Sequence, residues 1–315
     1  MSNLKLINMQ DIEVEAINWL WYPFIPYGKV TIIQGDPGEG KTTLVLQIIA
    51  RLTKGESIIN EDANPPINVI YQTAEDGLAD MIKPRLLAAN ADCSKVLVID
   101  DKDTPLTMRD VRLEQAIIET NAKLVVLDPI QGFLGADVDM HRANEIRPVM
   151  KHIAELAEKY KCAIILIGHM NKCSVGKSAY RGLGSIDFQA AARSVLIVGR
   201  IKDEPEIRVV CQTKSSLAPE AKAVAFRLSE ENGFEWIGEY DVTADDLLSG
   251  TAKGTKKQEA MDFLEKLLAD GQMLQTAIME LAVKKGIAEK TLRNAKEALG
   301  IISKRVNNQW YWSLN

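Results

Sequence analysis

Residues 35–43 read Gly35-Asp36-Pro37-Gly38-Glu39-Gly40-Lys41-Thr42-Thr43, which fits the pattern G-x-x-x-x-G-K-[ST]. An apolar run at residues 30–33 precedes this stretch, and residues 44–50 follow it with apolar side chains at helical spacing. In the order strand, glycine loop and helix, backbone N–H groups and a helix N-terminus surround a phosphate. The spacing alone also fits an ordinary glycine-rich turn, but the Lys41-Thr42 pair and the flanking elements favour a phosphate-binding loop.

The residue types in this loop have defined chemical roles. The glycines allow the backbone to approach phosphate without a Cβ clash. Lys41 is expected to reach the outer phosphates of a nucleotide, and Thr42 is expected to offer its hydroxyl to Mg²⁺. We therefore predict that residues 35–43 bind a nucleotide together with Mg²⁺.

Length and composition are those of an ordinary globular protein with one large domain and a smaller one. The chain has 315 residues and a net charge of −5, so any nucleic-acid surface has to be local. Its four cysteines are far apart, which fits neither a disulfide framework nor a metal site and suits a reducing compartment. The sequence opens with no signal peptide pattern and has no apolar run of membrane-spanning length, so we expect a cytoplasmic protein with no membrane partner.

The expected core domain covers residues 29–245. Strand-like apolar runs alternate with helical patterns, which predicts an α/β fold with a mostly parallel, covered sheet. The expected strands are 67–72, 96–99, 124–127 and 163–169, and the expected helices are 78–89, 108–120 and 143–160. A short helix at 186–193 and consecutive antiparallel strands at 194–198, 207–212 and 223–228 follow, and the sheet pattern fades after Trp236.

Two further segments flank this core. Residues 1–28 carry a dense aromatic patch from Trp19 to Tyr27. We expect this patch to cover the core or to contact another subunit, rather than to stack on nucleic-acid bases. Residues 246–257 are small, polar and basic, which predicts a linker. Residues 258–315 are expected to form three helices and a hairpin, the order of a winged helix-turn-helix domain. From residue 253 onward there are eleven Lys and Arg against seven Asp and Glu, which points to an acidic partner.

Two carboxylates are candidates for the chemistry of hydrolysis. Asp128 ends an apolar strand, where it could be a turn residue, but the phosphate loop upstream favours a role beside Thr42 in holding Mg²⁺. The next residue is Pro129, so the group that orients the attacking water must come from elsewhere. Glu75 is the best candidate, because the ends of parallel strands converge; its alternative role is to stabilise the N-terminus of the next helix.

Five motifs follow one another along the chain: residues 35–43, Thr73-Ala74-Glu75-Asp76-Gly77, Leu127-Asp128-Pro129, Gly168-His169-Met170-Asn171-Lys172 and Tyr180-Arg181-Gly182-Leu183-Gly184-Ser185. They occur in the order seen in the plasmid RepA replicative helicases, and the chain resembles that family. The family belongs to the RecA-like ATPases, alongside DnaB-type helicases. The resemblance covers about residues 15–240, and the whole layout, with the terminal winged helix, looks like the RepA-like ATPases of phages and mobile elements.

This resemblance implies a homohexameric ring that binds ATP and Mg²⁺ between its subunits. Glu75 would be the catalytic carboxylate, and Lys41 and Asp128 would serve the phosphates and the metal. His169 would be a sensor of the γ-phosphate, although His169 alone could be a satisfied core histidine. Arg181 would be the finger inserted into a neighbouring site, with Lys214 and Arg193 as the other candidates.

Two loops and the C-terminal domain are candidates for nucleic-acid contact. In RecA-like rings, loops such as 132–147 and 171–184 line a pore for single-stranded DNA, which singles out Arg142 and Lys177. Asp137 and Asp139 argue against a strongly positive wall there, and Lys177 without the family would be an ordinary surface lysine. In the winged helix the expected outward cations are Lys290, Arg293, Lys304 and Arg305, which could bind duplex DNA, dock a replication protein or form a solvated face.

The function that these patterns favour is a Mg²⁺-dependent ATP-hydrolysing motor on single-stranded DNA, in the form of a hexameric replicative helicase of a mobile element or phage. The alternative is an ATP-controlled DNA-binding regulator or helicase loader that uses its winged helix. A RecA-type recombinase is a weaker third, because one sequence does not distinguish a filament from a ring.

Overall fold

The computed structural model describes residues 5–59, 63–170, 186–202, 204–249, 256–269, 271–287, 289–307 and 309–314. Its centre is a nine-stranded sheet in the order β11-β10-β9-β8-β3-β7-β6-β4-β5. The strands are β3 Val30–Gly35, β4 Val69–Thr73, β5 Val96–Leu97, β6 Leu124–Asp128, β7 Ala163–His169, β8 Ser194–Ile201, β9 Glu204–Ser215, β10 Ala223–Ser229 and β11 Gly233–Tyr240. Neighbouring strands from β8 to β5 are parallel, which confirms the predicted mostly parallel sheet.

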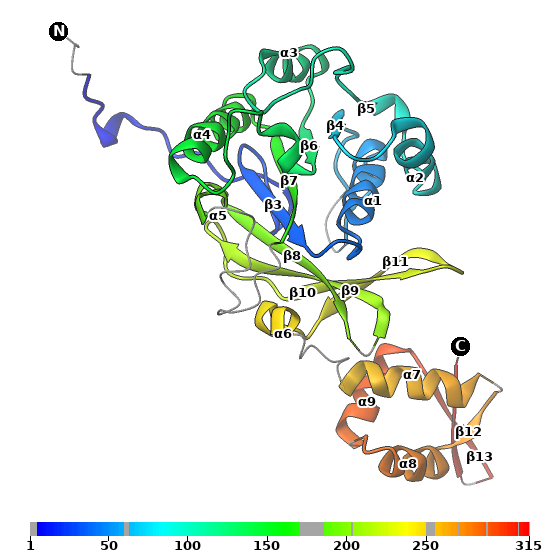
Figure 1. Cartoon of the computed structure of the whole chain (residues 1–315). Coiled ribbons are helices and arrows are strands. Elements are labelled where there is room, and N and C mark those ends of the chain that lie inside the picture. The colour runs from blue at the N-terminus through cyan, green and yellow to red at the C-terminus, as the bar shows by residue number, and fades with distance from the viewer. Residues whose placement is uncertain are drawn as a thin grey trace.

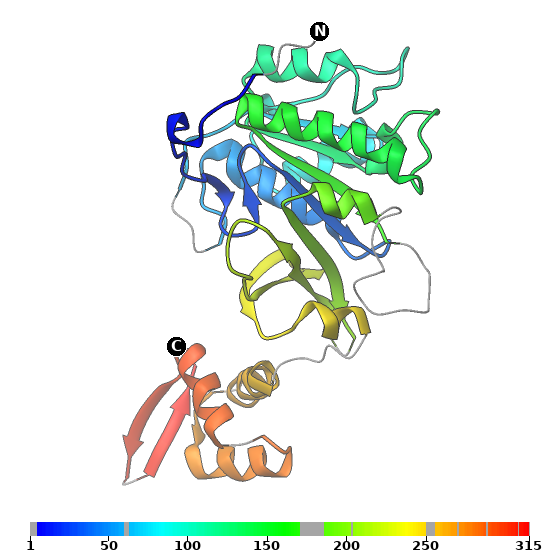
Figure 2. The same cartoon turned by 90° about the vertical axis from the view of Figure 1, so that its left-hand side faces the viewer.

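Helices cover both faces of the parallel strands (Figure 1). The helices of the core are α1 Lys41–Lys54, α2 Lys83–Ala88, α3 Val111–Thr120, α4 Ala143–Tyr160, α5 Ile186–Ala191 and α6 Ala244–Ser249. Buried residues of α1 and α2 pack on one face of the sheet, and those of α3, α4 and α5 pack on the other, as the turned view also shows (Figure 2). Because both faces are covered, the strands between them are near-continuous apolar runs, which is why they could be found in the sequence.

Short helical turns connect several of these elements. The 3₁₀ turns are η1 Met9–Asp11, η3 Cys93–Lys95 and η4 Ile130–Phe133, and the π-helical turn η2 Leu78–Ile82 leads directly into α2. Among the helices of the described ranges, none combines the length and the hydropathy that crossing a membrane requires.

The far side of the sheet is antiparallel from β8 to β11, as predicted for its first three strands. The expectation that the sheet pattern ends after Trp236 is wrong, because β11 continues to Tyr240. β11 lies at the edge of the sheet, and its half-buried residues Phe234 and Trp236 pack against the core. After Trp236 the pairing with β10 is irregular at Ile237, which interrupts the alternation of apolar residues along the strand.

The aromatic patch near the N-terminus forms a small hairpin, β1 Trp19–Trp21 and β2 Ile25–Pro26. Leu20, Trp21, Phe24 and Ile25 are buried in the same cluster as α1. The ring of Trp21 lies 4.4 Å from that of Phe24 and 6.0 Å from that of Trp236 on β11. The hairpin therefore packs on the core, and Tyr22 at its turn is exposed.

The C-terminal residues have their own hydrophobic cluster, built from α7 Lys256–Leu268, α8 Gln275–Lys284 and α9 Glu289–Ala298. A three-stranded antiparallel sheet in the order β12-β14-β13 completes it, with β12 Met273–Leu274, β13 Ile302–Val306 and β14 Gln309–Ser313. The expected linker 246–257 overlaps the end of α6 and the start of α7. The division into domains and the winged-helix interpretation stay predictions.

Replacing Trp21 by Ala should lower the free energy of unfolding by about 3–5 kcal/mol, because the ring is only 1% exposed. Tyr22→Ala is the matched control: its side chain is 52% exposed, so we expect a change below about 1.5 kcal/mol. Urea denaturation followed by circular dichroism measures both values. A Trp21→Ala protein as stable as the wild type would contradict the packing of the hairpin on the core.

Candidate functional site

The loop after β3 has the backbone that a phosphate site needs. Gly38 and Gly40 have φ angles of +81° and +88°, in the left-handed region that favours glycine. Gly40 is also the N-cap of α1, and it provides no side-chain acceptor for the first N–H groups of the helix. These N–H groups at the positive end of the helix dipole are therefore open to an anion.

The strands behind the loop determine its position. A Cβ at Gly35 would collide with the carbonyl oxygen of Val198 on β8. A Cβ at Gly40 would lie 2.8 Å from Cδ1 of Leu228 on β10. The loop thus rests against β8 and β10, and this close packing disfavours any side chain at its two glycines.

Lys41 lies at the start of α1 and is only 5% exposed. Its Nζ donates hydrogen bonds of 2.8 Å each to the carbonyl oxygens of Gly35 and Asp36. Burial lowers the pKa of Lys41, and the nearby carboxylates of Asp128 and Asp36 act in the opposite direction. The ammonium is therefore held on the inner side of the loop, where the outer phosphates of a nucleotide would lie.

Thr42 and Asp128 are 86 positions apart in the sequence but in contact in the structure. The Thr42 hydroxyl donates a 2.7 Å hydrogen bond to Oδ2 of Asp128. The same oxygen accepts a 2.9 Å hydrogen bond from the hydroxyl of Tyr71, which comes from β4. Burial raises the pKa of Asp128, and the two hydrogen bonds lower it in part. The sequence prediction paired Thr42 with Asp128, but nothing in the apolar run around Tyr71 indicated that its hydroxyl would reach this site.

These two oxygen groups fit a magnesium ion that is shared with a nucleotide. Mg²⁺ prefers oxygen ligands and is commonly held by one or two protein groups together with phosphates and water. In the part of the chain that the structure describes, no group of three or more His, Cys, Asp or Glu side chains could hold a metal by itself. Thr42 and Asp128 would hold Mg²⁺ beside the phosphate loop, and the phosphates would supply the remaining charge.

Glu75 and His169 come together at the same edge of the sheet, with 3.7 Å between Oε2 of Glu75 and Nε2 of His169. The Glu75 side chain is 63% exposed, whereas Nδ1 of His169 is buried and has no hydrogen-bond partner among the described residues. His169 is therefore not a satisfied core histidine. Glu75 also does not cap the next helical turn, whose N-cap is Gly77 without a side-chain hydrogen bond.

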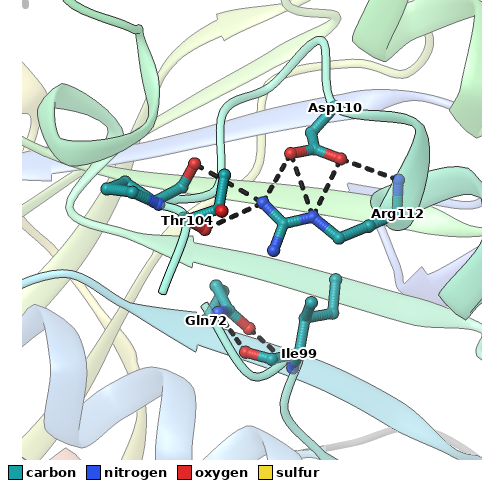
Figure 3. Close-up of polar contacts among 6 residues, drawn as sticks. Gln72, Ile99, Thr104, Asp110 and Arg112 are labelled. Carbon is teal, nitrogen blue, oxygen red and sulfur yellow. Dashed lines mark hydrogen bonds and ion pairs between the residues drawn. The ribbon is translucent and has the colours of Figure 1, made fainter. Parts of the chain in front are cut away.

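The strand that leads to Glu75 is held by side chains shown in Figure 3. The Gln72 amide donates to the carbonyl oxygen of Ile99 at 2.9 Å and accepts from its N–H at 3.1 Å. Gln72 therefore extends the pairing of β4 beyond the short strand β5. In the same view the Arg112 guanidinium binds the Asp110 carboxylate at 2.6 Å and the carbonyl oxygen of Thr104 at 2.9 Å, which closes the following loop.

Arg200 on β8 is a second residue near the site that the sequence prediction missed. Its guanidinium donates to the carbonyl oxygen of Gly38 at 3.3 Å and lies 3.8 Å from Oε1 of Glu39. A single arginine in an apolar strand gives no sequence signal for such a contact. It adds positive charge to the outer side of the phosphate loop.

Of the three candidate trans cations, the two that the structure describes, Lys214 and Arg193, lie away from this site. Lys214 pairs with Val195 at the start of β8, at the opposite end of the sheet from the loop. Its Nζ donates to the carbonyl oxygens of Gln189 and Ala190 at the end of α5, at 2.7 and 3.1 Å. Arg193 lies at the same end, where its backbone N–H donates to Val30. Arg181 and Lys177 lie outside the described residues.

The remaining candidate nucleic-acid residues are on the surface. Arg142 forms ion pairs with Asp139 at 3.3 Å and Glu145 at 3.2 Å, so its charge is locally neutralised. Arg293 pairs with Glu289 at 2.8 Å on α9. Lys304 and Arg305 are exposed on β13, and the side chain of Lys290 lies outside the described residues. The predicted contacts of these residues with nucleic acid stay predictions.

Comparison with known proteins agrees with the geometry of the core. Residues 3–175 match the sequence family described as an AAA domain. Protein RecA of Marinobacter nauticus is 22% identical over 303 residues, which cover 88% of this chain and 84% of that protein. DNA repair protein RadA of Halalkalibacterium halodurans is 27% identical over 165 residues, which cover 51% of this chain.

The match to RadA spans about a third of that protein's length, 32%. Among solved structures, a KaiC-like protein from Pyrococcus horikoshii is similar with a TM-score of 0.49 and 19% identity. That similarity covers 68% of this chain and 93% of the KaiC-like chain.

Proposed function

The chain belongs to the AAA domain family, and we propose that it is a Mg²⁺-dependent ATPase that acts as a motor on single-stranded DNA. The observation that carries this proposal is the arrangement of Lys41, Thr42 and Asp128 around one phosphate loop, with Glu75 on the neighbouring strand end. This set contains the parts that phosphoryl transfer requires: a phosphate cradle, a metal-side carboxylate and a free carboxylate for water.

In this mechanism the loop and Lys41 bind the phosphates of ATP, and Thr42 and Asp128 hold the metal. Mg²⁺ supplies charge stabilisation on the phosphate oxygens when it is bound. Glu75 lies beyond these groups on the open side, where its exposed carboxylate can orient and deprotonate a water molecule. His169 lies 3.7 Å from Glu75, so its role is to sense the state of the phosphates through that carboxylate.

Glu75→Gln should keep ATP binding and lower turnover by at least about 100-fold, because the amide cannot accept the proton of the attacking water. Asp80→Asn is the matched control, since Asp80 is an exposed acid in the next helical turn. Steady-state phosphate release and binding of a fluorescent nucleotide measure the two properties. Turnover near the wild-type rate in Glu75→Gln would rule out this carboxylate as the base.

Action on DNA is supported by the relatives and by the surface. One relative is called a DNA repair protein, and the chain presents the C-terminal cations Lys304 and Arg305 on its surface. Single-stranded DNA binds such surfaces through phosphate contacts that weaken with salt. The finer proposal is a homohexameric replicative helicase of a mobile element or phage, with a C-terminal winged helix that binds duplex DNA or a replication protein.

The second candidate is an ATP-controlled DNA-binding regulator or helicase loader. The observation that favours it is the local neutralisation of Arg142 by Asp139 and Glu145, which weakens the wall of a DNA pore. In a regulator, the C-terminal elements would select a DNA site or partner, and ATP would control assembly.

For a motor, single-stranded DNA should raise the ATPase rate about tenfold or more, and ring-shaped particles should form in ATP and Mg²⁺. Electron microscopy and phosphate release, each with and without DNA, measure these properties. Strand displacement on a forked substrate separates the candidates. ATPase activity without displacement, together with sequence-selective binding of duplex DNA, would favour the regulator.

The site is proposed to be completed by a neighbouring subunit. Lys214 and Arg193 lie at the far end of the sheet, and Arg181 is the third candidate for the trans cation. Mixing Arg181→Ala with Lys41→Ala subunits should recover activity, because a mixed interface can join an intact loop to an intact finger. If no ratio of the two recovers activity, Arg181 does not act in trans, and the same mixture with Lys214→Ala tests the next candidate.

A further inference from the structure

Tyr71 is a buried phenol in the middle of β4. The residue is 0% exposed, and its ring belongs to the apolar cluster that joins α1 and α2 to the sheet. Its hydroxyl reaches a carboxylate: it donates a 2.9 Å hydrogen bond to Oδ2 of Asp128 on the adjacent strand β6. The one polar atom of an otherwise apolar side chain thus contacts Asp128, the carboxylate expected beside the metal.

The chemistry of burial makes this contact informative. A phenylalanine would fill the same space in the cluster, whereas a buried hydroxyl is costly unless it is hydrogen-bonded. Within the described residues, the hydroxyl of Tyr71 has Asp128 as its hydrogen-bond acceptor. The packing of the core therefore explains the aromatic ring of Tyr71 but not its hydroxyl. The hydrogen bond to Asp128 explains the hydroxyl.

Two donors hold the same carboxylate oxygen, but they belong to different parts of the fold. Thr42 is on the first turn of α1, where the phosphate loop joins the helix, and its oxygen is itself an expected metal ligand. Tyr71 is on β4, which pairs in parallel with β6 from Val69↔Leu124 to Thr73↔Asp128. The phenol is thereby fixed by the sheet rather than by the phosphate loop, so it can hold Asp128 while Thr42 serves the metal.

We propose that Tyr71 is a positioning residue, which holds the Asp128 carboxylate in place for the divalent cation of the bound nucleotide. The inference rests on the proposed Mg²⁺-dependent nucleotide site. Tyr71 also lies four positions before Glu75, so β4 carries the residue that holds Asp128 and leads, two residues beyond its end at Thr73, to the proposed catalytic carboxylate.

The test measures the binding of a fluorescent ADP, first in EDTA and then across a series of Mg²⁺ concentrations. Tyr71→Phe removes one hydroxyl and keeps the ring. It should raise the half-saturating Mg²⁺ concentration about tenfold, the effect of losing one hydrogen bond to a charged group, while the Kd in EDTA stays within about twofold. That metal-free Kd also reports that the variant is folded.

Tyr160→Phe is the matched control. The Tyr160 hydroxyl donates a 2.6 Å hydrogen bond to the carboxylate of Glu114, between α4 and α3 and away from the phosphate loop. This variant loses the same kind of bond and should keep the wild-type dependence on Mg²⁺. In an Asp128→Asn background, adding Tyr71→Phe should change the half-saturating Mg²⁺ concentration by less than about twofold, because the hydroxyl acts through the carboxylate.

Three results would overturn the inference. A Tyr71→Phe protein with the wild-type dependence on Mg²⁺ shows that the hydroxyl does not position Asp128. Equal weakening of ADP binding with and without Mg²⁺ shows a merely structural role. If the wild type itself binds ADP with no dependence on Mg²⁺, both the proposed function and this inference are wrong. The first two results contradict only the inference and leave the proposed function intact.

Discussion

Backbone hydrogen bonds between parallel strands hold β3 between β7 and β8, and all six residues of β3 are buried. This register places Gly35 opposite His169, and the pairing of β4 with β6 places Thr73 opposite Asp128. The carboxyl ends of four strands therefore meet at one edge. The phosphate loop, the metal-side carboxylate and the Glu75–His169 contact are all consequences of that alignment.

The strands and helices of the core could be predicted because their apolar patterns are strong. β7 and α4 match the expected ranges, and the loop motif gives Lys41 and Thr42 directly. The contact of Tyr71 with the site could not be predicted, because an apolar run in the sequence does not indicate which side chain a buried hydroxyl will hydrogen-bond. The identity of that side chain depends on strand order, and here β6 lies between β4 and β7 in space although β5 follows β4 in the chain.

The predictions that could not be made from the sequence concern the edge of the sheet and the surface contacts of charged side chains. The end of β11 was missed because an irregularity in its pairing with β10 interrupts the alternation of apolar residues after Trp236. Lys214 is visible in the sequence as a cation, but its contact with the carbonyl oxygens of α5 depends on how that helix packs. The cations of α9 and β13 are visible in sequence, yet ion pairs such as Arg293 with Glu289 decide how much charge they present.

The opposite positions of the phosphate loop and Lys214 on one sheet have a consequence for symmetry. In a two-fold dimer, a contact from the loop edge of one copy to the Lys214 edge of the other is repeated in reverse, so the two sheets would have to run antiparallel and the pair would be closed. In a head-to-tail contact, by contrast, each copy offers its loop edge to one neighbour and its Lys214 edge to the other. Such an arrangement has a direction, and it either closes into a ring or continues as a helical filament.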